Sequence, residues 1–127
     1  MKIEDILRDK GLARFGDSLV NFLFSLAITR TSGRPTGLRM DNKILAEAVR
    51  KSTLRGLIPR RTDRKAVGDY AEAIIAYAWL KGIITTDESI EILARDLDNP
   101  VNAFKNLIEK IMEDSMEHVD KDSQKGN

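Results

Sequence analysis

The segment from Ala66 to Leu80, AVGDYAEAIIAYAWL, constrains the fold of this chain more than any other stretch. Almost every residue in it is apolar or small, and only Asp69 and Glu72 carry charge. Because these carboxylates interrupt the run, it does not predict a membrane-spanning helix. Burying a carboxylate without a partner costs several kcal/mol. A fold that uses this segment must therefore compensate both charges.

The rest of the chain also shows helical rather than strand periodicity. In the region from Leu19 to Leu26 apolar residues recur at helical spacing, and no segment shows sustained alternation. The sequence predicts an all-α helical bundle of about six helices, near residues 3–10, 13–30, 42–52, 64–81, 87–98 and 100–117. We expect one domain over residues 1–117 and a polar, flexible tail over residues 118–127.

Capping residues mark the ends of these helices. Gly11 is expected to stop the first helix, and Gly82 to follow the fourth as its C′ residue. The expected N-caps are Asp41 or Asn42, Asp63, Thr86 and Asn99, the last of them followed by Pro100 at the first helical position.

The residue inventory excludes several kinds of site. The chain has no cysteine and a single histidine, so disulfides, thiolate metal sites and His-rich zinc sites are not expected. Any metal would have oxygen ligands, which favours hard cations such as Mg²⁺ or Mn²⁺. The charged N-terminal segment has no apolar core typical of a secretory signal, and we expect a cytoplasmic protein.

Charge is distributed unevenly along the chain. Residues 30–65 contain eleven Lys and Arg residues against three acidic residues, whereas residues 66–127 contain six against thirteen. A basic segment of this kind indicates a surface that faces a polyanion. Alternatively, the positive and negative charges lie on separate solvent-exposed helix faces without any partner.

Two of the predicted helices share a local pattern. FGDSLVNFLFSLA (15–27) and VGDYAEAIIAYAW (67–79) each place Gly and Asp at the start of a long apolar helical body. Glycine inside a helix costs about 1 kcal/mol relative to alanine, so its presence suggests close approach of the backbones. We expect the helices to cross at Gly16 and Gly68, with Asp17 facing Asp69. Glu72 lies on the same helix face as Asp69.

Three converging carboxylates have two possible explanations. A divalent metal would bind their oxygens and could support phosphodiester hydrolysis. Alternatively, the acids form ordinary ion pairs, Asp69 with Lys65 and Glu72 with Arg14. The spacing of the residues leaves both explanations open.

Three segments resemble one known family. GDSLVNFLFSLA resembles the first signature of the ribonuclease III catalytic domain, DNKILAEAVR resembles the helix that follows it, and KAVGDYAEAIIAYAWLKG resembles the last signature. They occur in the family's order between Phe15 and Gly82. The chain resembles a minimal form of the family, Mini-III-like or archaeal ribonuclease III-like, which lacks the double-stranded-RNA-binding domain.

This resemblance implies an all-α endonuclease fold that forms a homodimer and cleaves double-stranded or structured RNA, such as ribosomal RNA precursors, with Mg²⁺ or with Mn²⁺ in its place. By motif position, Asp17, Asp69 and Glu72 would be catalytic metal ligands. Lys65 would lie near the scissile phosphate, and Asn42 would support the site.

Basic residues would then contact RNA phosphates, which suits a duplex that is recognised mainly by shape and backbone. The candidates are Arg34, Arg39, Lys43, Arg50, Lys51, Arg55, Arg60, Arg61 and Arg64.

One departure from the family pattern supports an alternative function. The first signature usually has a glutamate four residues before its aspartate, and here that position is Ala13. A catalytically weak or inactive fold could instead act as an RNA-binding or ribosome-associated factor. All-α nucleotide pyrophosphohydrolases are a third class, but their usual E-x-x-E and later E-x-x-D arrangement does not occur here.

Overall fold

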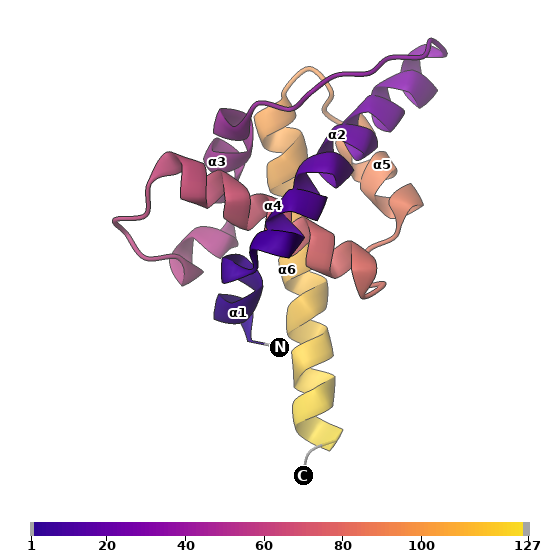
Figure 1. Cartoon of the computed structure of the whole chain (residues 1–127). Coiled ribbons are helices and arrows are strands. Elements are labelled where there is room, and N and C mark those ends of the chain that lie inside the picture. The colour runs from indigo at the N-terminus through magenta and orange to yellow at the C-terminus, as the bar shows by residue number, and fades with distance from the viewer. Residues whose placement is uncertain (1, 126–127) are drawn as a thin grey trace.

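The computed structural model describes the backbone of residues 2–125 and the side chains of residues 2–115. Figure 1 shows an all-helical chain, and no strand occurs within residues 2–125. The expected all-α bundle of six helices is confirmed. Its elements are α1 (Ile3–Arg8), α2 (Lys10–Ser32), α3 (Asn42–Arg50), the 3₁₀ helix η1 (Thr53–Leu57), α4 (Arg64–Leu80), α5 (Thr86–Ala94) and α6 (Pro100–Lys125).

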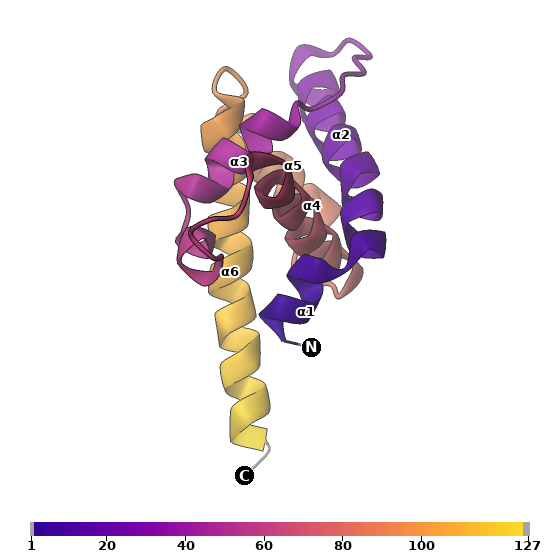
Figure 2. The same ribbon diagram turned by 60° about the vertical axis from the view of Figure 1, so that its left-hand side comes forward.

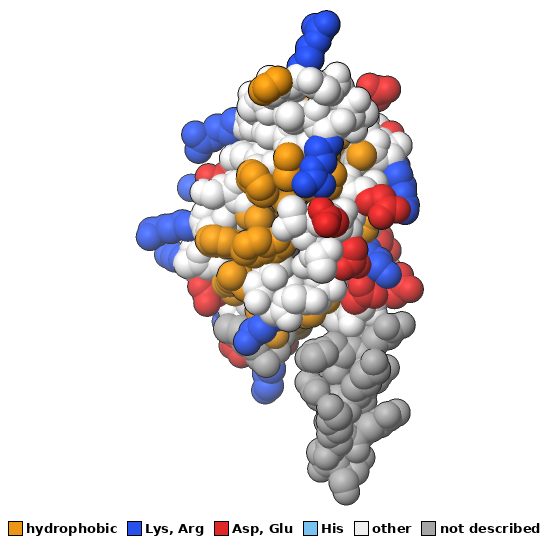
Figure 3. All heavy atoms as spheres, turned by 90° about the vertical axis from the view of Figure 1, so that its right-hand side faces the viewer, with side chains coloured by type: hydrophobic (Ala, Val, Ile, Leu, Met, Phe, Trp, Pro, Cys, Tyr) orange, Lys and Arg blue, Asp and Glu red, His pale blue; other side chains and the backbone are white. Residues whose placement is uncertain are grey.

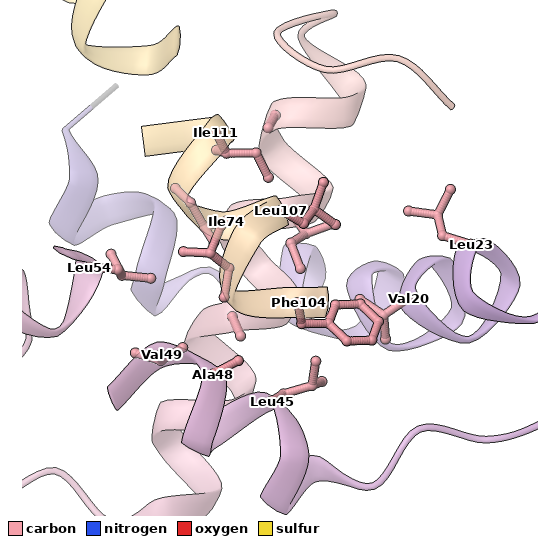
Figure 4. Close-up of a cluster of buried hydrophobic side chains, with 14 of the residues drawn as sticks. Val20, Leu23, Leu45, Ala48, Val49, Leu54, Ile74, Phe104, Leu107 and Ile111 are labelled. Carbon is pink, nitrogen blue, oxygen red and sulfur yellow. The ribbon is translucent and has the colours of Figure 1, made fainter. Parts of the chain in front are cut away.

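Helix α4, the apolar segment singled out above, lies at the centre of the bundle. It packs against α1, α2, α3 and α6, as the two views of the ribbon show (Figures 1 and 2). Its alanines at positions 71, 73, 76 and 78 are fully buried, so neighbouring helices approach closely. In the core, Phe104 of α6 packs against Phe24 of α2 with ring centroids 5.6 Å apart, and Figure 4 shows Phe104 within the cluster of buried side chains. The apolar composition of α4 thus follows from contact with neighbours on several sides.

The start of α2 differs from the sequence prediction. Asp9 is its N-cap and accepts a hydrogen bond from the backbone N–H of Leu12 at 3.0 Å. The helix therefore begins at Lys10, and the expectation that Gly11 ends a helix and that the next begins near Ala13 was wrong. Glycine is tolerated here because the first turn lacks the full set of internal hydrogen bonds.

The other caps mostly match their predictions. Asp41 and Asp63 cap α3 and α4, and Gly82 follows α4 with a left-handed φ of 73°. The prediction of Thr86 as the cap of α5 was wrong, because Thr85 forms a reciprocal capping box with Glu88.

Thr86 has a different role. Its hydroxyl accepts a hydrogen bond from the indole N–H of Trp79 at 2.9 Å, which ties α5 to α4. At the C-terminus, α6 continues to Lys125, past the end expected near position 117. Flexibility of the tail stays a prediction, and residues 126–127 lie outside the described part of the chain.

An apolar patch remains exposed on α2 and at the end of α4. Phe15 and Phe22 of α2 are 41% and 52% exposed, and Leu80 of α4 is 54% exposed. The Phe15 ring lies tilted against that of half-buried Trp79, with ring centroids 5.8 Å apart. Figure 3 shows hydrophobic side chains gathered in a band across one face. By length and composition α2 could cross a membrane, and it is the one such helix among the described residues. Here, however, it packs against α4 and α5.

Candidate active site

The carboxylates predicted from the sequence line one hollow. Asp17 comes from α2, whereas Asp69 and Glu72 come from consecutive turns of α4. Lys65 and Asn42 line the same hollow, whose volume is about 550 Å³. The structure thus brings together all five residues that the resemblance assigned to a site. Their catalytic and metal-binding roles stay predictions.

Two glycines make this convergence possible, though each has a different neighbour. A Cβ on Gly16 would overlap the backbone carbonyl of Glu72, so α2 lies directly on the α4 backbone. A Cβ on Gly68 would overlap the side-chain amide of Asn42. The expectation that the two glycines meet at one helix crossing was therefore wrong. Gly68 makes room for a site side chain from α3, and Gly16 alone brings α2 against α4.

Glu72 is the most perturbed group of the hollow. Only 4% of the residue is exposed, and its Oε1 accepts a hydrogen bond from Asn42 Nδ2 at 3.3 Å. Burial, followed by the negative charges of Asp17 and Asp69, raises the pKa of Glu72 to about 8. Oε2 is buried and has no hydrogen-bond partner among the described residues. An unpartnered carboxyl oxygen of this kind calls for a ligand.

The ion-pair alternative for these acids was not found. Neither Asp69 with Lys65 nor Glu72 with Arg14 forms a salt bridge within the described side chains. Asp17 instead pairs with Arg39, at 3.6 Å between Oδ2 and the guanidinium nitrogen.

The hollow does not form a closed metal cage. Within residues 2–115, no three His, Cys, Asp or Glu side chains are arranged to enclose an ion. Its oxygen donors and the free Glu72 Oε2 nevertheless fit a hard divalent cation, because Mg²⁺ commonly uses one or two protein carboxylates and keeps several waters.

Of the basic residues in the hollow, Lys10 was not predicted from the sequence, and Arg14 was predicted only as an ion-pair partner of Glu72. Lys10 and Arg14 line it beside Lys65, so the acids face three cations. Lys10, Arg14 and Asp17 share one face of α2, at spacings of four and three residues. This relation was hidden because Lys10 was assigned to the first helix. Asp9, a good N-cap residue just before it, was the signal that could have revealed it.

The predicted RNA-binding arginines and lysines are mostly exposed. Arg34, Lys43, Lys51, Arg60, Arg61 and Arg64 have exposed side chains and form no salt bridge within the described residues, whereas exposed Arg50 lies 3.8 Å from Glu47.

Arg55 differs because its guanidinium donates to the backbone carbonyls of Ile58 and Arg60, at 3.1 and 3.3 Å. It therefore holds the loop that carries Arg60 and Arg61.

Comparison with known protein families identifies a match. A family model described as Ribonuclease III matches residues 10–121, from the first residue of α2 into α6. No curated protein matches the chain. The matched range includes every residue that lines the hollow.

Proposed function

Because the chain belongs to the ribonuclease III family, we propose that it is a metal-dependent endoribonuclease that cleaves double-stranded or structured RNA. The observation that carries this proposal is the buried, unpartnered Oε2 of Glu72 in a hollow shared with Asp17 and Asp69. Ribosomal RNA precursors are the type of substrate that the resemblance suggests. The proposed place of action is the cytoplasm.

The side chains of the hollow have complementary parts in this reaction. Glu72, Asp17 and Asp69 would hold a Mg²⁺ or Mn²⁺ ion, one or two of them directly and the rest through water, and the bound ion supplies Lewis-acid stabilisation of phosphate charge and an activated water. The Asn42 amide holds the Glu72 carboxyl through Oε1, which leaves Oε2 free for the ligand. Lys65, exposed at the start of α4, would offset negative charge on the phosphate.

RNA binding would extend outward from the hollow. Arg34, Arg39, Lys43, Arg50, Lys51, Arg60, Arg61 and Arg64 would contact phosphates directly, and Arg55 would order the loop of Arg60 and Arg61. Contacts of this kind are independent of sequence and weaken with salt.

The metal requirement and the acids can be tested together. Wild-type protein should cleave a labelled RNA duplex in Mg²⁺ or Mn²⁺, and EDTA should stop it. Asp69→Asn should reduce the single-turnover rate by about 100-fold or more, since it removes a carboxylate that would hold the metal ion. Asp87→Asn, an exposed acid on α5, is the control and should cleave normally. Equal rates for Asp69→Asn and wild type would contradict the proposal.

Ala13 favours a second candidate, an RNA-binding factor without catalysis. It lines the hollow where relatives carry a glutamate, and Lys10 and Arg14 lie next to it. On this alternative the wild-type protein binds the duplex in a salt-dependent way, and neither metal ion supports cleavage.

We also propose that the protein is a homodimer, with the apolar patch of Phe15, Phe22, Trp79 and Leu80 in the interface. Exposed aromatic side chains of this kind are typical of interface centres. Phe22→Glu should convert the dimer to a monomer in light-scattering chromatography. Leu57→Glu, which places the same charge on exposed η1, should remain dimeric. A wild-type monomer at micromolar concentration would contradict this assignment.

A further inference from the structure

Residues 34–40, here called the strap, run back along the C-terminal half of α2 to α3 (Figure 1). Side chains of α2 hold its backbone. Ser25 Oγ accepts from the Leu38 N–H at 3.0 Å and donates to the Leu38 carbonyl at 3.3 Å. Thr29 Oγ1 makes the same pair of bonds with Thr36, at 2.9 and 3.2 Å. Hydroxyl groups of α2 thus make the backbone hydrogen bonds that a neighbouring β-strand would otherwise make with an extended segment.

The hydrogen bonds between the strap and α2 follow a regular register that runs toward the candidate site. Asn21 accepts a hydrogen bond from the N–H of Met40, one step beyond the serine contact. Four residues of helix rise about 6.0 Å and two residues of extended chain about 6.6 Å, so the two spacings stay matched. One further step along α2 reaches Asp17, which this register would match with position 42. Arg39 lies between Leu38 and Met40, the two residues held by Ser25 and Asn21, and its guanidinium extends to Asp17 at 3.6 Å. The hydrogen bonds of its neighbours therefore fix the backbone from which Arg39 reaches the carboxylate hollow.

Apolar burial explains only one end of this arrangement. Met40 is buried in the core, but every residue from 34 to 39 is exposed, so most of the strap buries little apolar surface to offset the entropy of ordering it. The Asp17–Arg39 pair is 3.6 Å long, with 46% and 83% of the two side chains exposed, and pairs of this kind contribute little. The guanidinium can accordingly leave Asp17 for a stronger partner.

We propose that Arg39 contacts the phosphate beside the RNA bond that is cut, and that Asn21, Ser25 and Thr29 are positioning residues that hold it there. The inference rests on the proposed endoribonuclease function and assigns Arg39 to the reacting phosphate rather than to the duplex in general. A guanidinium binds phosphate oxygens in a two-pronged geometry. A phosphodiester carries the same single negative charge as Asp17, but it gains charge as its bond is cleaved, whereas a bound cation would offset the charge of Asp17.

Single-turnover cleavage of a labelled RNA duplex in saturating Mn²⁺ tests the contact. Arg39→Gln should lower the rate by about tenfold or more, and Arg39→Lys should restore part of it. Ser25→Ala should lower the rate several-fold with an unchanged melting temperature. Ser18→Ala removes a hydroxyl from the same helix outside the register, and it should cleave like wild type.

A variant that combines Ser25→Ala with Arg39→Gln distinguishes a positioning role of Ser25 from a general defect of the fold. Ser25→Ala should have no further effect in the Arg39→Gln background, because its effect acts through that arginine. An equal loss in both backgrounds would overturn the positioning role. Wild-type cleavage by Arg39→Gln would overturn the assignment while leaving the proposed function intact. A wild-type chain that does not cleave in either metal ion would overturn both.

Binding of Mn²⁺ without RNA provides a readout independent of cleavage. Arg39 places a positive charge next to Asp17, so Arg39→Gln should bind Mn²⁺ equally or about threefold more tightly in a calorimetric titration. A weaker affinity together with slower cleavage would show a structural defect and would overturn the phosphate contact.

Discussion

Replacing Glu72 with glutamine is expected to stabilise the metal-free protein at pH 8 and to abolish RNA cleavage. Glutamine keeps the side-chain shape and can still accept the hydrogen bond from Asn42. It removes the carboxylate charge that burial and the neighbouring acids disfavour. The rate of cleavage should fall by about 100-fold or more, because a proposed metal ligand is lost. Conflict between stability and activity is typical of functional sites.

The pH dependence follows from the direction of the pKa change. The pKa of Glu72 rises from 4.5 to about 8, so between these values the folded protein holds a proton that the unfolded chain has released. Its contribution to stability is complete below pH 4.5 and declines as pH rises toward 8. Glu72→Gln should therefore change stability little at pH 4.5 and raise it by roughly 2–4 kcal/mol at pH 8.

Urea unfolding in EDTA at both pH values measures this difference. Glu91→Gln is a matched control, because its carboxylate is 70% exposed in an ion pair with Arg95. It should show no comparable gain at pH 8. A Glu72→Gln protein less stable than wild type at pH 8 would mean that the buried carboxylate is compensated in the metal-free fold.

Replacing Gly16 with alanine is expected to destabilise the fold by roughly 2–4 kcal/mol. The added Cβ would overlap the backbone carbonyl of Glu72, which cannot rotate away as a side chain could. Helices α2 and α4 would have to separate, although the better helix propensity of alanine recovers up to about 1 kcal/mol. Thermal and urea unfolding measure the effect.

Gly56→Ala provides the comparison, because a Cβ at this position would meet no atom within 4 Å. Its stability should stay within about 0.5 kcal/mol of wild type. If Gly16→Ala were as stable as Gly56→Ala, close contact between the α2 and α4 backbones would not be required.

The fold could be predicted from the sequence because most of its signals are local. Helical periodicity, the Asp41 and Asp63 caps and Gly82 are readable within a few residues of each helix end. The boundary before Lys10 was missed because Gly11 was interpreted as the end of a helix. Asp9, two residues earlier, is the N-cap that decides where α2 begins.

The candidate site could be predicted only in part. The Gly-Asp pattern indicated that Asp17 and Asp69 lie near one another, and they do share one hollow. The atoms that Gly16 and Gly68 contact depend on how α2, α3 and α4 pack together. The spacing of residues along the sequence does not reveal this packing. The environment of Arg39 likewise depends on a segment that reverses direction after α2.

The register between the strap and α2 also limits how the chain length can vary there. Adding one residue between positions 36 and 40 would turn alternate peptide groups away from Ser25 and Thr29, whereas adding two would restore their direction. The turn around Gly33 is exposed, and Gly33 itself has a left-handed φ of 73°. Length changes are therefore tolerated at the tip of this connection, and along the strap only in steps of two residues.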